Sequence, residues 1–172
     1  MQTVVLQKWS PEMAAEVERR RAMGADLYDE MWDGEYVMAP MSNVRHGALQ
    51  TRLWRVLDPY ARAQGLEVVG PFNLGTSQDF RCPDLGVVRE VVGDVLWVPT
   101  AALVVEVLSK RDRAWQKLGF YAAHGVEEVV IVDPADRTVA WLAREGEGFE
   151  PTERSALLDV AVAEVVVQVD WA

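Results

Sequence analysis

Two acidic residues and one lysine have the types and spacing needed for metal-assisted hydrolysis. Asp84 follows Pro83 at the head of one expected strand, and Glu106 lies 22 residues later inside a second apolar run. If these strands are neighbours, the two carboxylates converge and can bind a hard divalent cation through oxygen. Such a cation activates water and stabilises negative charge on a phosphodiester. Lys117 lies 11 residues beyond Glu106, where its charge could orient the attacking water or stabilise the transition state.

Glu106 is the residue that most strongly indicates a functional site. It interrupts the apolar run from Leu103 to Leu108, where a carboxylate without a partner would cost several kcal/mol. The structural alternative is a buried ion pair with an arginine, and we favour the functional interpretation. Taken alone, Asp84 is typical of a turn after proline, and Lys117 is typical of a solvated helix. The interpretation of both therefore depends on Glu106.

Other common catalytic arrangements are missing from the sequence. It has no G-x-G-x-x-G, Walker or G-x-S-x-G motif and no paired CxxC, and its two histidines are too few for a His-rich zinc site. His46, near a helix start, is more typical of a cap or a surface residue. Cys82 adjoins Asp84 but has no nearby histidine, so we interpret it as a packing residue.

A βαβ unit is predicted to position Glu106. Two nearly continuous apolar runs, Leu103–Leu108 and Val129–Val132, flank a segment with helical spacing. Continuous runs are typical of central parallel strands buried on both faces. The intervening helix should begin near Ser109 or Asp112 and end at Gly125. Its expected buried residues are Ala114, Trp115, Leu118, Tyr121 and Ala122.

The N-terminal part contains signals for two helices and a hairpin. Ser10-Pro11-Glu12 should open a helix that runs to about Met23, and Asp33-Gly34 should form a hairpin turn between 28–32 and 35–38. Ser42-Asn43 should cap a second helix that ends at Gly65.

Proline and apolar patterning refine the remaining expectations. Pro59 predicts either a kink in the second helix or a restart with Asp58 as a new cap. Three strands should follow, over 66–72, 73–76 and from Pro83 onward. After the βαβ unit, a strand over 138–143 and a hairpin at 145–148 are expected, whereas 161–171 fits either a strand or a helix.

Length and composition indicate one globular domain over residues 1–172. Half of the residues are hydrophobic, yet no apolar run approaches the ~20 residues needed to cross a bilayer. The single cysteine and the absence of a signal-peptide pattern favour the cytoplasm. A net charge of −10 counts against a protein that coats nucleic acid. It is compatible with an enzyme that uses a local basic strip and a metal.

Several motifs, in this order and spacing, resemble the bacterial putative restriction endonuclease family of the PD-(D/E)XK nuclease superfamily. They are Glu30-x-x-Asp33-Gly34-Glu35, His46, Pro83-Asp84, Glu106-Val107-Leu108-Ser109, Lys117-x-x-x-Tyr121, Gly125-Val126 and Val132-Asp133-Pro134. The resemblance implies an α/β fold, with a restriction-endonuclease-like mixed central sheet flanked by helices. It also implies cleavage of DNA that depends on Mg²⁺ or Mn²⁺.

The resemblance further implies roles for five residues. Asp84 and Glu106 would be metal ligands, and Glu30 or His46 from the N-terminal part would complete the site. The superfamily lysine would lie two residues after the glutamate, where this chain has Leu108. The family takes its cation from the following helix, which makes Lys117 the candidate.

Two other functions stay open at this stage. A degenerate nuclease fold could serve binding or assembly without catalysis, as the acidic charge and Leu108 would allow. A metal-dependent hydrolase of a small phosphorylated substrate is the second alternative. The sequence does not determine the cleavage site or the oligomeric state, and a homo-oligomer is compatible with it.

Overall fold

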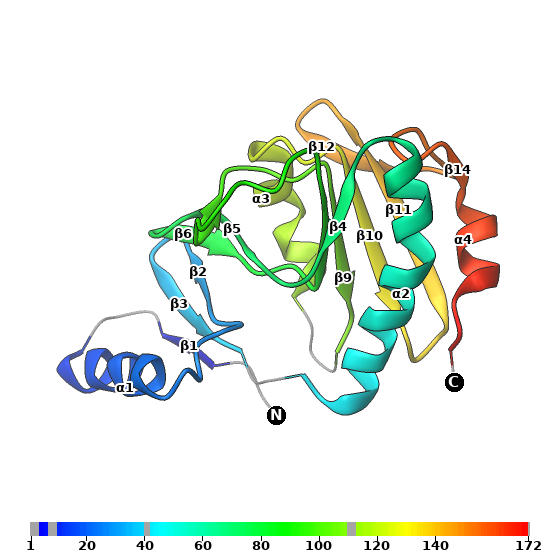
Figure 1. Ribbon diagram of the computed structural model, residues 1–172. Coiled ribbons are helices and arrows are strands. Elements are labelled where there is room, and N and C mark those ends of the chain that lie inside the picture. The colour runs from blue at the N-terminus through cyan, green and yellow to red at the C-terminus, as the bar shows by residue number, and fades with distance from the viewer. Residues whose placement is uncertain (1–3, 7–9, 40–41, 110–112, 172) are drawn as a thin grey trace.

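The chain forms two mixed sheets with helices around them in the computed structural model (Figure 1). The structure describes residues 4–6, 10–39, 42–109 and 113–171, with side chains from residue 10 onward. The first sheet has the order β1 (Val4–Leu6), β3 (Glu35–Met38), β2 (Glu30–Trp32), β6 (Asp79–Arg81), β5 (Asn73–Thr76) and β8 (Trp97–Val98). The second has the order β12 (Gly148–Pro151), β11 (Thr138–Glu145), β10 (Glu128–Asp133), β9 (Leu103–Val107), β7 (Leu85–Val88) and β4 (Glu67–Val69).

The remaining elements are four α-helices, one short 3₁₀ helix and a small two-stranded ribbon among the described residues. The helices are α1 (Pro11–Ala22), α2 (Val44–Ala63), the 3₁₀ helix η1 (Ala114–Lys117), α3 (Leu118–Ala123) and α4 (Val162–Gln168), and the ribbon pairs β13 (Arg154–Ser155) with β14 (Val160–Ala161). The two helices and the hairpin predicted for the N-terminal part are confirmed. Ser10 and Asn43 cap α1 and α2 through their side chains, and β2 and β3 form a hairpin around Asp33.

The predicted βαβ unit is confirmed and lies at the centre of the second sheet. Strand β9 pairs in parallel with β10 on one side and antiparallel with β7 on the other. Both faces of β9 are buried, which explains its nearly continuous apolar sequence. Leu103 and Val105 pack in the core with α2 and α4, whereas Val104 packs with residues of α3 and β5. Because side chains alternate along a strand, Glu106 shares the face of Val104, between the two sheets.

The buried carboxylate of Asp29 links the hairpin β2–β3 to helix α1. Asp29 is 2% exposed and accepts hydrogen bonds from the Arg20 guanidinium at 2.6 and 2.8 Å and from the Tyr36 hydroxyl at 2.8 Å. The backbone N–H of Ala39 donates to the same carboxylate. These bonds hold the position of the strand that begins at Glu30.

Proline does not interrupt the second helix. Helix α2 continues through Pro59 to Ala63, so the predicted restart at Asp58 is wrong. Pro59 is exposed, and the buried stripe of Leu49, Leu53, Leu57 and Ala61 lies on another part of the helix surface. Packing of that stripe outweighs the hydrogen bond that proline cannot donate.

The crossover between β9 and β10 differs from the predicted helix. In the part of the crossover that the structure describes, regular structure begins at Ala114, first as a 3₁₀ turn and then as α3. Asp112, one of the two predicted starts, lies outside the described residues. In a 3₁₀ turn, residues three apart share a face. Ala114 and Lys117 are therefore buried, whereas Trp115, predicted to be buried, is 52% exposed.

The remaining predictions concern the strands after α2 and the C-terminal tail. The predicted strand over 66–72 is confined to β4, and the chain adds β6 and β8, which the sequence analysis missed. The strand over 138–143 and its hairpin are confirmed as β11 and β12, and the ambiguous tail forms α4. In the described parts of the chain, no helix is long and apolar enough to span a membrane.

Candidate active site

Asp84 is held at the start of β7 by groups from β9 and α2. Its backbone N–H donates to the carbonyl of Val105, and its Oδ2 accepts a hydrogen bond of 2.7 Å from the backbone N–H of Val107. These two bonds bracket Glu106 in the neighbouring strand. The other oxygen, Oδ1, lies 2.8 Å from His46 Nε2 and accepts a 2.8 Å bond from the Gln50 amide. Two predicted residues, Asp84 and His46, are therefore in direct contact.

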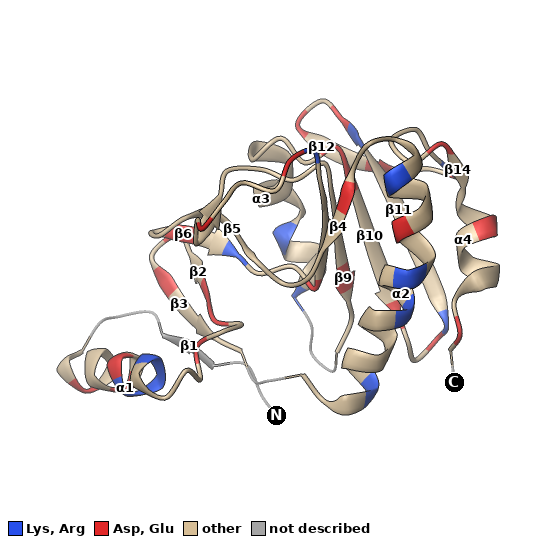
Figure 2. Cartoon of the chain, in the orientation of Figure 1, with Lys and Arg blue, Asp and Glu red and all other residues tan. Residues whose placement is uncertain are grey.

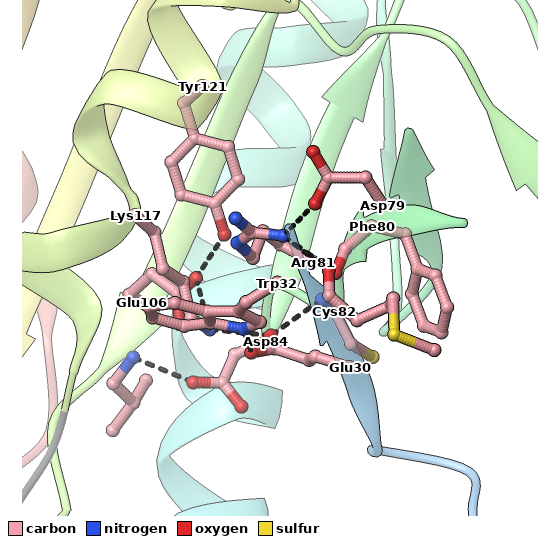
Figure 3. Close-up of polar contacts among 12 residues, drawn as sticks. Glu30, Trp32, Asp79, Phe80, Arg81, Cys82, Asp84, Glu106, Lys117 and Tyr121 are labelled. Atoms are coloured by element: carbon pink, nitrogen blue, oxygen red, sulfur yellow. Dashed lines mark hydrogen bonds and ion pairs between the residues drawn. The ribbon is translucent and has the colours of Figure 1, made fainter. Parts of the chain in front are cut away.

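Glu106 is buried, and its partners come from the crossover helices (Figure 3). The Lys117 ammonium lies 2.9 Å from Oε1 and 3.1 Å from Oε2, and the Tyr121 hydroxyl donates to Oε1. An ion pair was the structural alternative for this residue, but its cation is the lysine proposed for catalysis and not an arginine. Tyr121 was expected to be only a packing residue, so its polar role was missed.

Glu30 supplies a second carboxylate to the same lysine. Its Oε1 lies 2.8 Å from Lys117 Nζ and accepts a 2.7 Å bond from the backbone N–H of Cys82. Its Oε2 accepts a 2.6 Å bond from the Trp32 indole N–H. The hairpin β2–β3 thus places a carboxylate against a cation that lies 87 positions later in the chain. Side-chain contacts thus join the five predicted residues in two groups, Asp84 with His46 and Glu106 with Lys117 and Glu30, and the backbone bonds of Asp84 to β9 link the two groups.

The pKa values in this cluster reflect one ammonium group, that of Lys117, and the carboxylates of Glu106, Asp84 and Glu30. Burial raises the pKa of Glu106 to about 7, and the Asp84 and Glu30 carboxylates add to the rise, while Lys117 opposes it. Burial alone would lower the pKa of Lys117, but Glu106 and Glu30 outweigh burial and raise it. The lysine therefore keeps its proton, and the carboxylates have more negative charge than this cation can neutralise.

A stack of cations and aromatic rings borders the cluster. The Arg81 guanidinium lies 4.5 Å from the Trp32 ring and 4.0 Å from the Phe120 ring, and the Arg113 guanidinium lies 3.9 Å from Trp32. Arg81 also donates a 2.6 Å bond to the carbonyl of Met31. These contacts fix the ring whose indole N–H holds Glu30. The sequence analysis missed the stack, because its members come from β2, β6 and the crossover.

Cys82 has no catalytic character. Burial raises the pKa of its thiol to about 12, and the Glu30 carboxylate contributes to the rise. A thiol with so high a pKa stays protonated at neutral pH, and the thiolate is the nucleophilic form. This agrees with the prediction that Cys82 serves packing, and its backbone N–H additionally holds Glu30.

A second buried carboxylate has a different environment. Glu128 accepts hydrogen bonds from the Trp141 indole, the Ser155 hydroxyl and the backbone N–H of Leu157. It lines a cavity of about 730 Å³ that is also lined by Arg89 and Arg144 and that contains none of the five candidate residues. Its donors are neutral, so its carboxylate is typical of a structural anchor.

Asp84 and Glu106 have the oxygen donors that a hard divalent cation prefers. Mg²⁺ is usually bound in proteins by one or two carboxylates together with waters and substrate phosphates, and a larger protein cage is not needed. Within residues 10–39, 42–109 and 113–171, no group of three or more His, Cys, Asp or Glu side chains is placed to hold a metal. Asp84 and Glu106 are the two carboxylates predicted to bind the ion, and the charge of Asp84 contributes to the raised pKa of Glu106.

Comparisons with known proteins gave matches for both the fold and the sequence. A solved structure of a putative nuclease belonging to DUF820, from Anabaena variabilis ATCC 29413, matches with a TM-score of 0.62 and 15% identity over 82% of this chain and 90% of that chain. The match confirms the predicted restriction-endonuclease-like α/β fold. No curated protein matches the sequence. The family model described as Uma2, putative restriction endonuclease, matches residues 15–172, and the chain therefore belongs to that family.

Proposed function

We propose that this protein is a metal-dependent DNA endonuclease whose active site contains Asp84, Glu106 and Lys117. The observation that carries the proposal is the Lys117 ammonium, buried between the carboxylates of Glu106 and Glu30, with Asp84 bonded to the backbone of Val107 beside Glu106. A buried cluster with more carboxylates than cations is complementary to a divalent metal ion. Membership in a family described as putative restriction endonuclease supports nuclease function in general.

Asp84 and Glu106 would hold Mg²⁺ or Mn²⁺. When bound, the ion supplies Lewis-acid stabilisation of phosphate charge and a water molecule of lowered pKa. The backbone N–H of Val107 and the side chains of His46 and Gln50 fix the orientation of Asp84 before any ligand arrives. His46 therefore acts through Asp84, as a positioning residue.

Lys117 would stabilise charge on the phosphodiester in the transition state. A buried ammonium next to the reacting group is effective because little water competes for it. Glu30 is the second partner of this ammonium and would keep it in place when Glu106 turns to the metal. We therefore assign to Glu30 the positioning of Lys117.

The helix beside the site has the charge that DNA would require. Although the chain has a net charge of −10, α2 contains four arginines and one acidic residue, Asp58 (Figure 2). Arg45 and Arg55 are exposed on this helix, and His46 and Gln50 from its N-terminal part contact Asp84. A local basic strip of this kind can attract phosphates against an acidic background.

One alternative has a specific observation in its favour. Both carboxylates and the lysine already have partners within the protein, as they would in a noncatalytic scaffold with a structural ion pair. Hydrolysis of a small phosphorylated substrate gains no such support, because the 730 Å³ cavity lies among other residues.

Cleavage of a supercoiled plasmid tests the proposed function. The purified protein with Mg²⁺ or Mn²⁺ should convert supercoiled DNA to relaxed and linear forms, and excess EDTA should abolish the conversion. Folded protein that leaves both the plasmid and single-stranded DNA intact with either metal at low salt would favour the noncatalytic scaffold.

A further inference from the structure

An exposed tryptophan lies on the same short turn as the candidate catalytic lysine. Trp115 is 52% exposed, whereas Lys117, two positions later in η1, is 8% exposed. The 3₁₀ period directs Lys117 inward to Glu106 and turns the indole of Trp115 outward. Folding therefore leaves a large apolar ring in water on the turn that carries Lys117.

The turn also holds a second basic residue. Arg113 directly precedes η1, and its guanidinium is fixed against the Trp32 ring at 3.9 Å and donates to the Gln116 side chain at 2.9 Å. The segment thus holds two cations and an exposed aromatic ring within five residues, with Lys117 buried against Glu106 and Arg113 half-buried against Trp32.

We propose that Trp115 stacks on an unpaired base of the DNA, beside the phosphodiester that Lys117 contacts. This inference rests on the proposed nuclease function and specifies its substrate as DNA with unpaired nucleotides at the cleavage site. Proteins that bind single strands combine basic groups for the backbone with aromatic rings for the bases. A base within a paired duplex is stacked on its neighbours and does not offer its face to an indole.

The chain contains another exposed apolar residue for comparison. Val167 on α4 is 85% exposed, and α4 contains none of the five candidate residues. A single exposed apolar residue is common on protein surfaces and does not by itself indicate a site. The proposal therefore requires that Trp115 and Val167 behave differently toward DNA.

Binding of labelled oligonucleotides tests the stacking directly. Fluorescence anisotropy would compare a single strand with its duplex, in EDTA and in Ca²⁺, for the wild type and for Trp115→Ala, Trp115→Phe and Val167→Ala. Trp115→Ala should weaken single-strand binding by roughly 5- to 100-fold and change duplex binding by less than about twofold. Trp115→Phe should restore most of the affinity, and Val167→Ala should match the wild type. Because Trp115 is exposed, all variants should melt at nearly the wild-type temperature.

A scan with abasic nucleotides adds a readout that a structural role would not change. Removing the base that stacks on Trp115 should weaken wild-type binding and leave Trp115→Ala almost unaffected. Equal losses for single strand and duplex, or equal losses in Trp115→Ala and Val167→Ala, would overturn the stacking. Cleavage of the same oligonucleotides with Mg²⁺ separates the two proposals. A wild type that cuts DNA while Trp115→Ala keeps its single-strand preference contradicts the stacking alone. A wild type that neither binds nor cuts DNA contradicts the nuclease function, and the stacking with it.

Discussion

The Lys117 ammonium contacts both carboxylate oxygens of Glu106, at 2.9 and 3.1 Å, across 11 positions of the chain. This contact explains how an acidic residue can lie in the middle of a buried strand. It also joins the two residues that the proposed chemistry needs most, the metal ligand and the transition-state cation. The superfamily resemblance predicts a lysine two residues after the glutamate, where this chain has Leu108, and Lys117 from the crossover is the proposed replacement.

Removing the lysine should strongly destabilise the metal-free protein. Lys117→Met keeps most of the side-chain volume but leaves Glu106 and Glu30 buried without their cation, which typically costs about 3–5 kcal/mol. Urea denaturation in EDTA measures the change in the free energy of unfolding. As a control, Arg89→Met removes the exposed Arg89–Glu127 pair and should cost at most about 1 kcal/mol. A Lys117→Met protein as stable as the control would show that the buried pair contributes little.

Stability in EDTA should depend on pH through Glu106. Burial raises its pKa to about 7 in the folded protein, so the folded state binds a proton that the unfolded state releases near the ordinary value of ~4.3. The contribution of Glu106 is therefore complete below that ordinary value and is lost as the pH rises through about 7. The stability of the wild type relative to Glu106→Gln should fall between pH 4.5 and pH 8 in urea titrations. A difference that stays constant over this range would contradict the raised pKa.

Glu30 should control how well the site binds metal. In Glu30→Gln, Lys117 loses one carboxylate and pairs more strongly with Glu106, so it competes with the metal for that ligand. The Mn²⁺ dissociation constant, measured by titration calorimetry, should rise by about tenfold or more, as is typical for loss of a group that orients a ligand. Glu35→Gln, on the same hairpin, removes one acidic charge and serves as the matched control. Equal effects in both variants would mean that Glu30 acts only through its charge.

Local sequence signals were sufficient to predict the two strands and the glutamate at the centre of the site. Continuous apolar runs identified β9 and β10, because strands buried on both faces need apolar residues at every position. Glu106 was conspicuous because it interrupts one of these runs. Lys117 was identified from its spacing after Glu106 within the family resemblance, since an isolated helix lysine gives no signal of its own.

Other features depend on contacts that no local pattern records. The two-residue strand β8 and the three-residue strand β6 are too short to have a readable period. The stack of Arg81 on Trp32 requires the pairing of β2 with β6, which brings together residues far apart in the sequence. The burial of Trp115 was predicted from an α-helical period, and the 3₁₀ turn changed which residues face the core.

The most direct measurement is the rate of plasmid cleavage with Mg²⁺ for the wild type, Glu106→Gln and Glu128→Gln. Glu128 is the matched control, because it is a buried carboxylate of the same fold with neutral donors and lies outside the candidate cluster. The amide is a poor replacement for an anionic metal ligand, so Glu106→Gln should cleave at least ~10²-fold more slowly than the wild type. Folded Glu128→Gln should cleave at nearly the wild-type rate. Equal cleavage by the wild type and Glu106→Gln would contradict the assignment of the active site.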